Sequence, residues 1–244
     1  MANRLIHVAL LPTLLRRDGR GHSAVCVVDL LRASTTIVRA IEAGAAAVRL
    51  VAEPAEALRE RDALGAGAAV AAGERGGVAP EGFDLGNSPA EFTRERIGGK
   101  TVVFTTTNGT RVLMAVKDAA LVVVGCLQNR RAVAERVAHH DGPVTIACAG
   151  TDGRIAMEDA LAAGAIVAAM VDRNGDAQLT DPARVCMWAW RAASADAGTL
   201  AAAVGESAGA KNLVKVGLAK DIAECVRTDV STAVPRWNGE AVVA

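Results

Sequence analysis

Three polar segments carry residue types that bind anionic ligands. They are DLLRASTT (29–36), TTTNGTR (105–111) and CAGTDGR (148–154), and each follows an apolar run and opens a helical pattern. Hydroxyls, Arg side chains and the free N–H groups of a helix N-terminus together make an anion site. Taken alone, each segment is better explained as an ordinary helix cap. Three such segments, each with an Arg, favour a site for an anion, which we expect to be a phosphate.

Carboxylates lie beside two of these segments. Asp29 ends a Val-rich run, and Glu158 and Asp159 open the helical pattern after the third segment, where they would also complement the helix dipole. A carboxylate at the end of a buried strand is costly unless it is paired or binds metal. The three acids suit Mg²⁺, which would neutralise charge and orient a water for hydrolysis of a phosphate ester. Asp29 as an attacking carboxylate is the alternative, although such enzymes commonly have a second Asp where Leu31 stands.

Two other functions remain open. Cys148 and Arg154 have the C-x₅-R spacing of phosphatases that use a cysteine nucleophile. A non-catalytic anion-binding protein of the same fold would use the same Thr-rich segments, but it would give the three acids no function.

In GERGG, Glu74 and Arg75 are either an ion pair that shapes a long loop or direct ligand contacts.

Short strands alternating with helices must position these residues. Apolar runs without alternation are typical of strands buried on both faces, and strand–helix alternation predicts a mainly parallel sheet covered by helices. We therefore predict one three-layer α/β/α domain over residues 1–244, with a mainly parallel or mixed sheet whose strand C-termini meet at one ligand-binding edge. The expected strands are 24–30, 46–52, 101–105, 120–125 and 143–150, and the expected helices are 34–44, 54–64, 109–119, 129–140 and 157–171.

The remaining segments have weaker patterns. The apolar N-terminus predicts an edge strand, and the Gly- and Pro-rich segment 73–90 predicts a long functional loop. Residues 206–217 read as a helix that ends at Gly217, residues 221–226 as one short turn or strand, and residues 230–235 as a final strand.

Composition excludes several classes of protein. Among 244 residues, 27 Lys and Arg balance 27 Asp and Glu, which argues against nucleic-acid binding. No apolar run is long enough for a membrane span. Five scattered cysteines without a C-x-x-C pair indicate neither a zinc site nor a disulfide framework, and a reduced cytoplasmic setting fits best. For assembly we keep a homodimer as an option.

Four ordered motifs resemble the 2-phosphosulfolactate phosphatase family of coenzyme M biosynthesis. They are VVDLLRASTTIV, GERGGVAPEGFDLGNSP, TTTNGTR and CAGTDGRIAMEDALAAG. The resemblance is close over 24–166 and looser over 205–235, where Asn212, Asp221 and Pro235 correspond. It implies an α/β, Mg²⁺-dependent enzyme that converts 2-phosphosulfolactate and water to 3-sulfolactate and phosphate. The third motif departs from the family at Arg154, and Ala156-Met157 replaces the expected Ser-Leu.

The resemblance also implies site residues, whose individual roles are our inference. A substrate that carries phosphate, carboxylate and sulfonate would match a site with three Arg side chains and Mg²⁺. The implied catalytic residues are Asp29, Arg32, Glu158 and Asp159, with Asp29, Glu158 and Asp159 as metal ligands. The implied substrate-binding residues are Ser34, Thr35, Glu74, Arg75, Thr107, Asn108 and Arg111.

Overall fold

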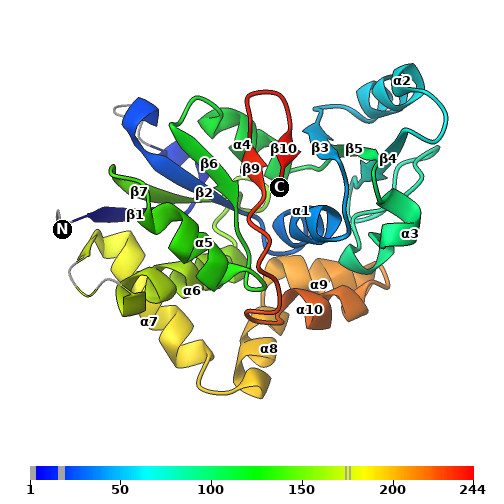
Figure 1. Ribbon diagram of the computed structural model, residues 1–244. Coiled ribbons are helices and arrows are strands. Elements are labelled where there is room, and N and C mark those ends of the chain that lie inside the picture. Colours follow the sequence, from blue (N-terminus) through cyan, green and yellow to red (C-terminus); the bar gives the residue numbers. More distant parts are fainter. Residues whose placement is uncertain (1–3, 16–19, 174, 176) are drawn as a thin grey trace.

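A ten-stranded mixed sheet forms the centre of the molecule (Figure 1). The computed structural model describes residues 4–15, 20–173, 175 and 177–244. Within them the strand order is β4-β5-β3-β10-β9-β6-β2-β7-β1-β8. One parallel group consists of β6 (Leu121–Val124), β2 (Ala24–Val28), β7 (Val144–Cys148), β1 (Leu5–Ala9) and β8 (Gln178–Leu179). The second consists of β4 (Ala69–Gly73), β5 (Thr101–Thr105) and β3 (Ala47–Leu50).

An antiparallel hairpin joins the two groups. Its strands are β9 (Arg236–Trp237), which pairs with β6, and β10 (Val242–Val243), which pairs with β3. Three successive antiparallel pairings therefore separate β3 from β6, so the two groups run in opposite senses along the ladder. The single common edge expected from the sequence is too simple a picture of this sheet.

Helices cover both faces of the sheet, which confirms the three-layer α/β/α prediction (Figure 1). They are α1 (Ala33–Glu42), α2 (Pro54–Leu64), α3 (Arg94–Ile97), α4 (Gly109–Val116), α5 (Arg130–Ala138), α6 (Met157–Arg173), α7 (Asp181–Ala193), α8 (Ala197–Gly205), α9 (Ala208–Lys215) and α10 (Ala219–Cys225). Three short 3₁₀ turns are η1 (Pro12–Leu14), η2 (Arg20–His22) and η3 (Pro89–Glu91).

The buried strand β2 shows how the layers are built. All five of its residues are buried, and successive side chains point to opposite faces. Val25 and Val27 pack in one apolar cluster with residues of α1 and α4. Cys26 and Val28 pack in another with residues of α5, α6 and α7. The continuous apolar run is thus the direct result of burial on both faces.

Several sequence expectations were wrong in detail. The N-terminal strand β1 is not at the edge, because β8 pairs with its outer side. Residues 221–225 lie in helix α10, which ends before Val226 and is too short to display a helical period. Residues 230–235 are not a strand, and the last pairing begins only after Pro235, at Arg236. The expected elements also lacked β4, whose Ala-Gly composition is unusual for a strand, as well as α7 and α8.

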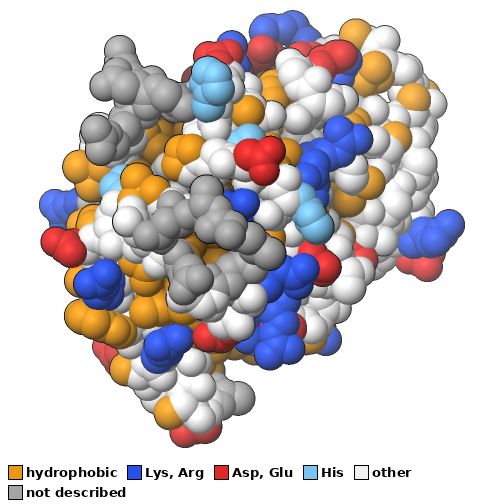
Figure 2. All heavy atoms as spheres, turned by 60° about the vertical axis from the view of Figure 1, so that its left-hand side comes forward, with side chains coloured by type: hydrophobic (Ala, Val, Ile, Leu, Met, Phe, Trp, Pro, Cys, Tyr) orange, Lys and Arg blue, Asp and Glu red, His pale blue; other side chains and the backbone are white. Residues whose placement is uncertain are grey.

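The surface agrees with the balanced composition. Acidic, basic and hydrophobic side chains are interspersed on the face around β1 and α7 (Figure 2). Among the described residues, no helix has the length and apolar character needed to cross a membrane.

Candidate active site

A cavity of about 460 Å³ lies where loops from the two strand groups meet. Its walls are the loops after β2, β4, β5 and β7, the first turn of α6, and the start of α9. Loops from strands of opposite sense therefore share one cavity, which the topology alone would not have predicted. The predicted site residues that line it are Asp29, Arg32, Glu74, Thr107, Asn108, Glu158 and Asp159.

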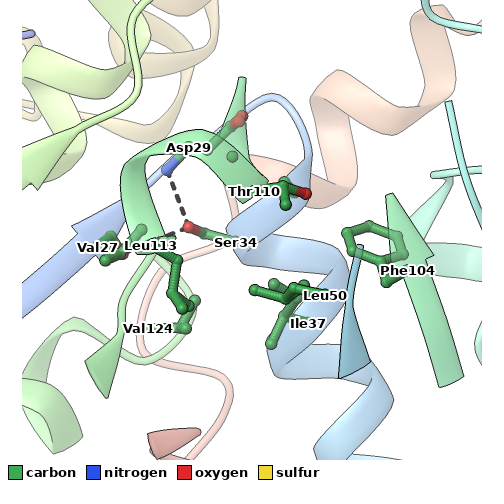
Figure 3. A pocket seen from close by; sticks show the side chains of 11 residues that line it. Val27, Asp29, Ser34, Ile37, Leu50, Phe104, Thr110, Leu113 and Val124 are labelled. Carbon is green, nitrogen blue, oxygen red and sulfur yellow. Dashed lines mark hydrogen bonds between the residues drawn. The ribbon is translucent and has the colours of Figure 1, made fainter. Parts of the chain in front are cut away.

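Ser34 and Thr35 do not line this cavity and instead shape the loop after β2. The Ser34 hydroxyl accepts a hydrogen bond from the Asp29 N–H at 2.8 Å (Figure 3). The Thr35 hydroxyl donates to the Leu30 carbonyl at 3.0 Å, and both side chains are buried. These hydroxyls fix the backbone that carries Asp29 and Arg32.

Arg75 and Arg111 also lie outside the cavity walls. Arg75 donates to the carbonyls of Glu74 and Ala52 and to the Thr105 hydroxyl, at 2.6–3.0 Å. Arg111 is exposed on α4. Of the three Arg side chains expected to match the substrate charge, only Arg32 lines the cavity.

Asp29 sits at the end of β2 against the first residue of α4. A Cβ on Gly109 would come within 2.9 Å of an Asp29 carboxylate oxygen and 2.7 Å of the Ala33 Cβ, so glycine permits this approach. The carboxylate points away from the apolar side chains beneath it (Figure 3). Burial, followed by the nearby Glu74 and Glu158 carboxylates, raises the pKa of Asp29 to about 7.

Asp159 ties two cavity loops together. Its carboxylate oxygens accept the N–H of Leu30 at 2.8 Å and the N–H of Gly150 at 3.0 Å. Burial, with Asp29 and Glu158 nearby, raises the pKa of Asp159 well above its ordinary value. With both oxygens engaged by backbone, Asp159 positions the loops after β2 and β7.

Glu158 is a buried acid of the site whose carboxylate is incompletely hydrogen-bonded among the described residues. Its side chain is buried, and its Oε2 has no hydrogen-bond partner among the described residues. Its Oε1 lies so close to α9 that a Cβ on Gly209 would overlap it. Burial raises the pKa of Glu158, and a hydrogen bond from Ser207 partly offsets this.

Glu74 is not an ion-pair partner of Arg75, which contacts its carbonyl instead. The Glu74 carboxylate accepts the N–H of Thr107 at 2.8 Å and the N–H of Gly77 at 2.8 Å. It therefore holds the loop after β5 against the loop after β4, and both of these loops line the cavity.

Arg32 is the buried cation of the cavity, with 3% of its surface exposed. It donates to Asp221 Oδ2 at 2.6 Å and to the Gly77 carbonyl at 2.6 Å. The second Asp221 oxygen accepts the Ser88 hydroxyl at 2.6 Å. This network fixes the guanidinium between α10 and the loop after β4.

Several residues at the site could not be identified from residue types and their spacing in the sequence. Asn87 lines the cavity, yet its sequence context reads as a helix cap. Asn212 and Asp221 were indicated only by the family resemblance. Gly209 belongs to a small-residue helix start, SAGA, that has no feature typical of a ligand site.

Most of the chain matches one protein family. The profile of the 2-phosphosulpholactate phosphatase family matches residues 10–240. The chain belongs to this family. It is 41% identical over 212 residues to a probable 2-phosphosulfolactate phosphatase of Pseudothermotoga lettingae, covering 86% of this chain and 88% of the relative. A protein of the same name from Deinococcus radiodurans is 37% identical over 232 residues, covering 94% and 92%.

Family membership does not identify the catalytic groups, so they must be inferred from the cavity. The structure does not support Cys148 as a nucleophile. Cys148 is buried, its thiol lies 3.7 Å from the Asp159 carbonyl, and burial raises its pKa well above the ordinary value. A nucleophilic thiol needs a lowered pKa and access to the ligand. Arg154 is exposed at the end of a turn that begins at Thr151.

Replacing Cys148 by Ala is therefore expected to leave kcat for phosphate release within about threefold of the parent. The loss of one small buried group should lower stability by roughly 1 kcal/mol. Steady-state phosphate release and urea unfolding measure the two effects. Complete loss of activity in a folded Cys148→Ala protein would reinstate the thiol as nucleophile.

The acids of this family member can also be tested as metal ligands. In the part of the chain that the structure describes, no three His, Cys, Asp or Glu side chains are arranged to hold a metal ion. Mg²⁺, however, is usually bound by one or two carboxylates together with phosphate oxygens and waters. Asp29 and Glu158 fit that requirement, because the Glu158 carboxylate raises the pKa of Asp29 and Glu158 Oε2 has no hydrogen-bond partner among the described residues. Asp159 fits it less well because both its oxygens already accept backbone N–H groups.

Proposed function

We propose that this chain is a phosphomonoester hydrolase whose substrate is 2-phosphosulfolactate, which it converts with water to 3-sulfolactate and phosphate. The observation that carries the proposal is a single cavity lined by Asp29, Glu158, the buried Arg32 and the loop that precedes helix α4. The family and the names of its relatives support this substrate.

The phosphoryl group would bind between Arg32 and the loop that opens α4. Thr107 and Asn108 precede the first residue of this helix, and the positive end of the helix dipole favours an anion. Arg32 is always charged and is held by Asp221, so it needs little reorganisation as charge develops on the phosphoryl oxygens.

Asp29 would act as the general base that accepts a proton from the attacking water. Without metal the pKa of Asp29 is about 7, and a bound Mg²⁺ would lower it, so the carboxylate would be ionised and able to accept a proton near neutral pH. As the water oxygen bonds to phosphorus, the ester P–O bond breaks, and the departing alkoxide oxygen takes up a proton. Phosphate and the free hydroxy acid are then the products.

Mg²⁺ is the proposed cofactor, held by Asp29 and Glu158, and when bound it would neutralise phosphate charge and orient a water. Asp159 would position Asp29 by fixing the backbone of Leu30. Glu74 would fix the phosphate-binding loop through the Thr107 N–H.

The cellular setting belongs to the same proposal. A product such as 3-sulfolactate fits a coenzyme M type pathway. A cytoplasmic location is supported by five cysteines that are all free and buried. A homodimer is an option for assembly, and organisation as a single domain is a prediction from the sequence.

The reaction is tested with 2-phosphosulfolactate and a panel of phosphorylated hydroxy acids, assayed for phosphate release with and without Mg²⁺. We expect release that EDTA abolishes and added Mg²⁺ restores. Turnover that EDTA leaves unchanged would contradict the metal, and no turnover of any member would contradict the enzyme. Binding of phosphate without turnover would instead favour a non-catalytic anion-binding protein.

A further inference from the structure

The start of helix α9 forms a wall of the cavity that the phosphate-binding groups do not use. Ala208, Gly209 and Asn212 line the cavity on this side. Ser207 caps the helix by accepting the Ala210 N–H at 3.1 Å. Among the described residues, the N–H groups of Ala208 and Gly209 have no acceptor. Two free donors and the positive end of a helix dipole thus border the cavity.

A second observation indicates that these donors receive an oxyanion. Glu158 is 2% exposed, and its carboxylate lies so close to this turn that Gly209 has no room for a Cβ. Within the described part of the chain, its Oε2 is buried and has no hydrogen-bond partner. The Glu158 carboxylate is therefore incompletely hydrogen-bonded at the start of α9, and an anion that fits the two N–H groups better can replace it.

The geometry points to the first turn of α9, Ala208 and Gly209 with Asn212, as the subsite for the non-reacting oxyanion of the substrate, which Glu158 occupies in its absence. This inference rests on the proposed function, because the substrate there carries a carboxylate and a sulfonate besides its phosphate. Either group presents several acceptor oxygens to the two N–H groups and to the Asn212 amide.

The sharpest test removes one donor and keeps the helix. Proline has no N–H and is well tolerated at the first position of a helix. Ser207, at φ −69° and ψ 156°, already has the extended conformation that a following proline requires. Ala208→Pro therefore deletes a single proposed contact. Ala197→Pro is the matched control, because Ala197 opens α8 after an extended, side-chain capping Asp196.

We expect Ala208→Pro to bind 3-sulfolactate about tenfold more weakly by isothermal titration calorimetry, the loss of one hydrogen bond to a charged group. Ala197→Pro should bind like the parent. Glu158→Gln, titrated in EDTA, should bind 3-sulfolactate more tightly than the parent, because the competing charge is removed. Unchanged affinity in both Ala208→Pro and Glu158→Gln would overturn the subsite.

Two simpler phosphate esters show whether the carboxylate or the sulfonate of the substrate binds at α9. Phospholactate keeps the carboxylate and lacks the sulfonate, whereas the phosphate ester of isethionate keeps the sulfonate and lacks the carboxylate. Ala208→Pro should raise KM only for the ester that retains the group bound at α9. Normal turnover by the parent with no KM change in the variant refutes the subsite alone, whereas no turnover by the parent refutes the proposed function. If Ala208→Pro does not fold, Asn212→Ala replaces it, because it removes another proposed donor and leaves Glu158 in place, and 3-sulfolactate binding should likewise weaken.

Discussion

Asp29→Asn is expected to lower kcat for phosphate release by about a thousandfold, the size of a lost general acid–base group. The amide keeps the shape of the carboxylate but can neither accept the water proton nor offer a charged ligand to Mg²⁺. KM should change much less, because Arg32, Thr107 and Asn108 remain in place. Steady-state kinetics measure the split. Asp118→Asn, which changes an exposed acid after α4, should retain parental kcat.

The same substitution is expected to stabilise the protein near pH 8 when EDTA removes metal. The raised pKa of Asp29, about 7, means that the folded state holds this proton more tightly than the unfolded state, whose pKa is near 3.8. Stability from this group is therefore complete below about pH 4 and is lost as pH rises through 7. Asn carries no charge, so Asp29→Asn should gain roughly 1–3 kcal/mol at pH 8, below the full linkage value because Asp29 is partly exposed.

Urea unfolding in EDTA at pH 8 and at pH 5 measures this gain, which should shrink at the lower pH. An equal gain at both pH values would show that the charge of Asp29 is not its cause. Asp29→Asn with parental kcat would remove the carboxylate from the mechanism.

Asp221→Ala is expected to destabilise the protein by about 3–5 kcal/mol, the cost of leaving a buried charge without its partner. Arg32 and Asp221 are 2% and 7% exposed and meet at 2.6 Å. The Ser88 hydroxyl would lose its acceptor as well. Asp172→Ala is the control, because its ion pair with Arg191 is exposed and should contribute less than about 1 kcal/mol. Urea unfolding of both variants measures the contrast.

The double variant Arg32→Met/Asp221→Leu separates stability from activity. Apolar side chains of similar volume commonly replace a buried ion pair at little cost, so this protein should be more stable than Asp221→Ala, although Ser88 and the Gly77 carbonyl lose a partner. It should nevertheless lose phosphate release, because Arg32 is the only Arg among the described cavity-lining residues. Retained activity in the double variant would exclude Arg32 as a phosphate ligand.

The local sequence determined most of the elements that carry the site. The apolar run at 24–28 became β2, because it is buried on both faces, and Pro54 and Leu64 bound α2 as expected. Such features depend on neighbours in the chain, so a single sequence contains them. Polar segments between strand and helix likewise indicated Asp29, Thr107 and Glu158, and all three line one cavity.

Only the tertiary structure decided which polar residues face a ligand and which support the backbone. Ser34 and Asp159 have the composition of ligands, but their oxygens accept backbone N–H groups from Asp29, Leu30 and Gly150. The same structure brings Asp221 to Arg32 across 189 residues of chain. Spacing along the sequence cannot reveal such pairs, because a hydroxyl or carboxylate serves a backbone amide and a phosphate by the same hydrogen bonds, and only three-dimensional packing decides which of them it meets.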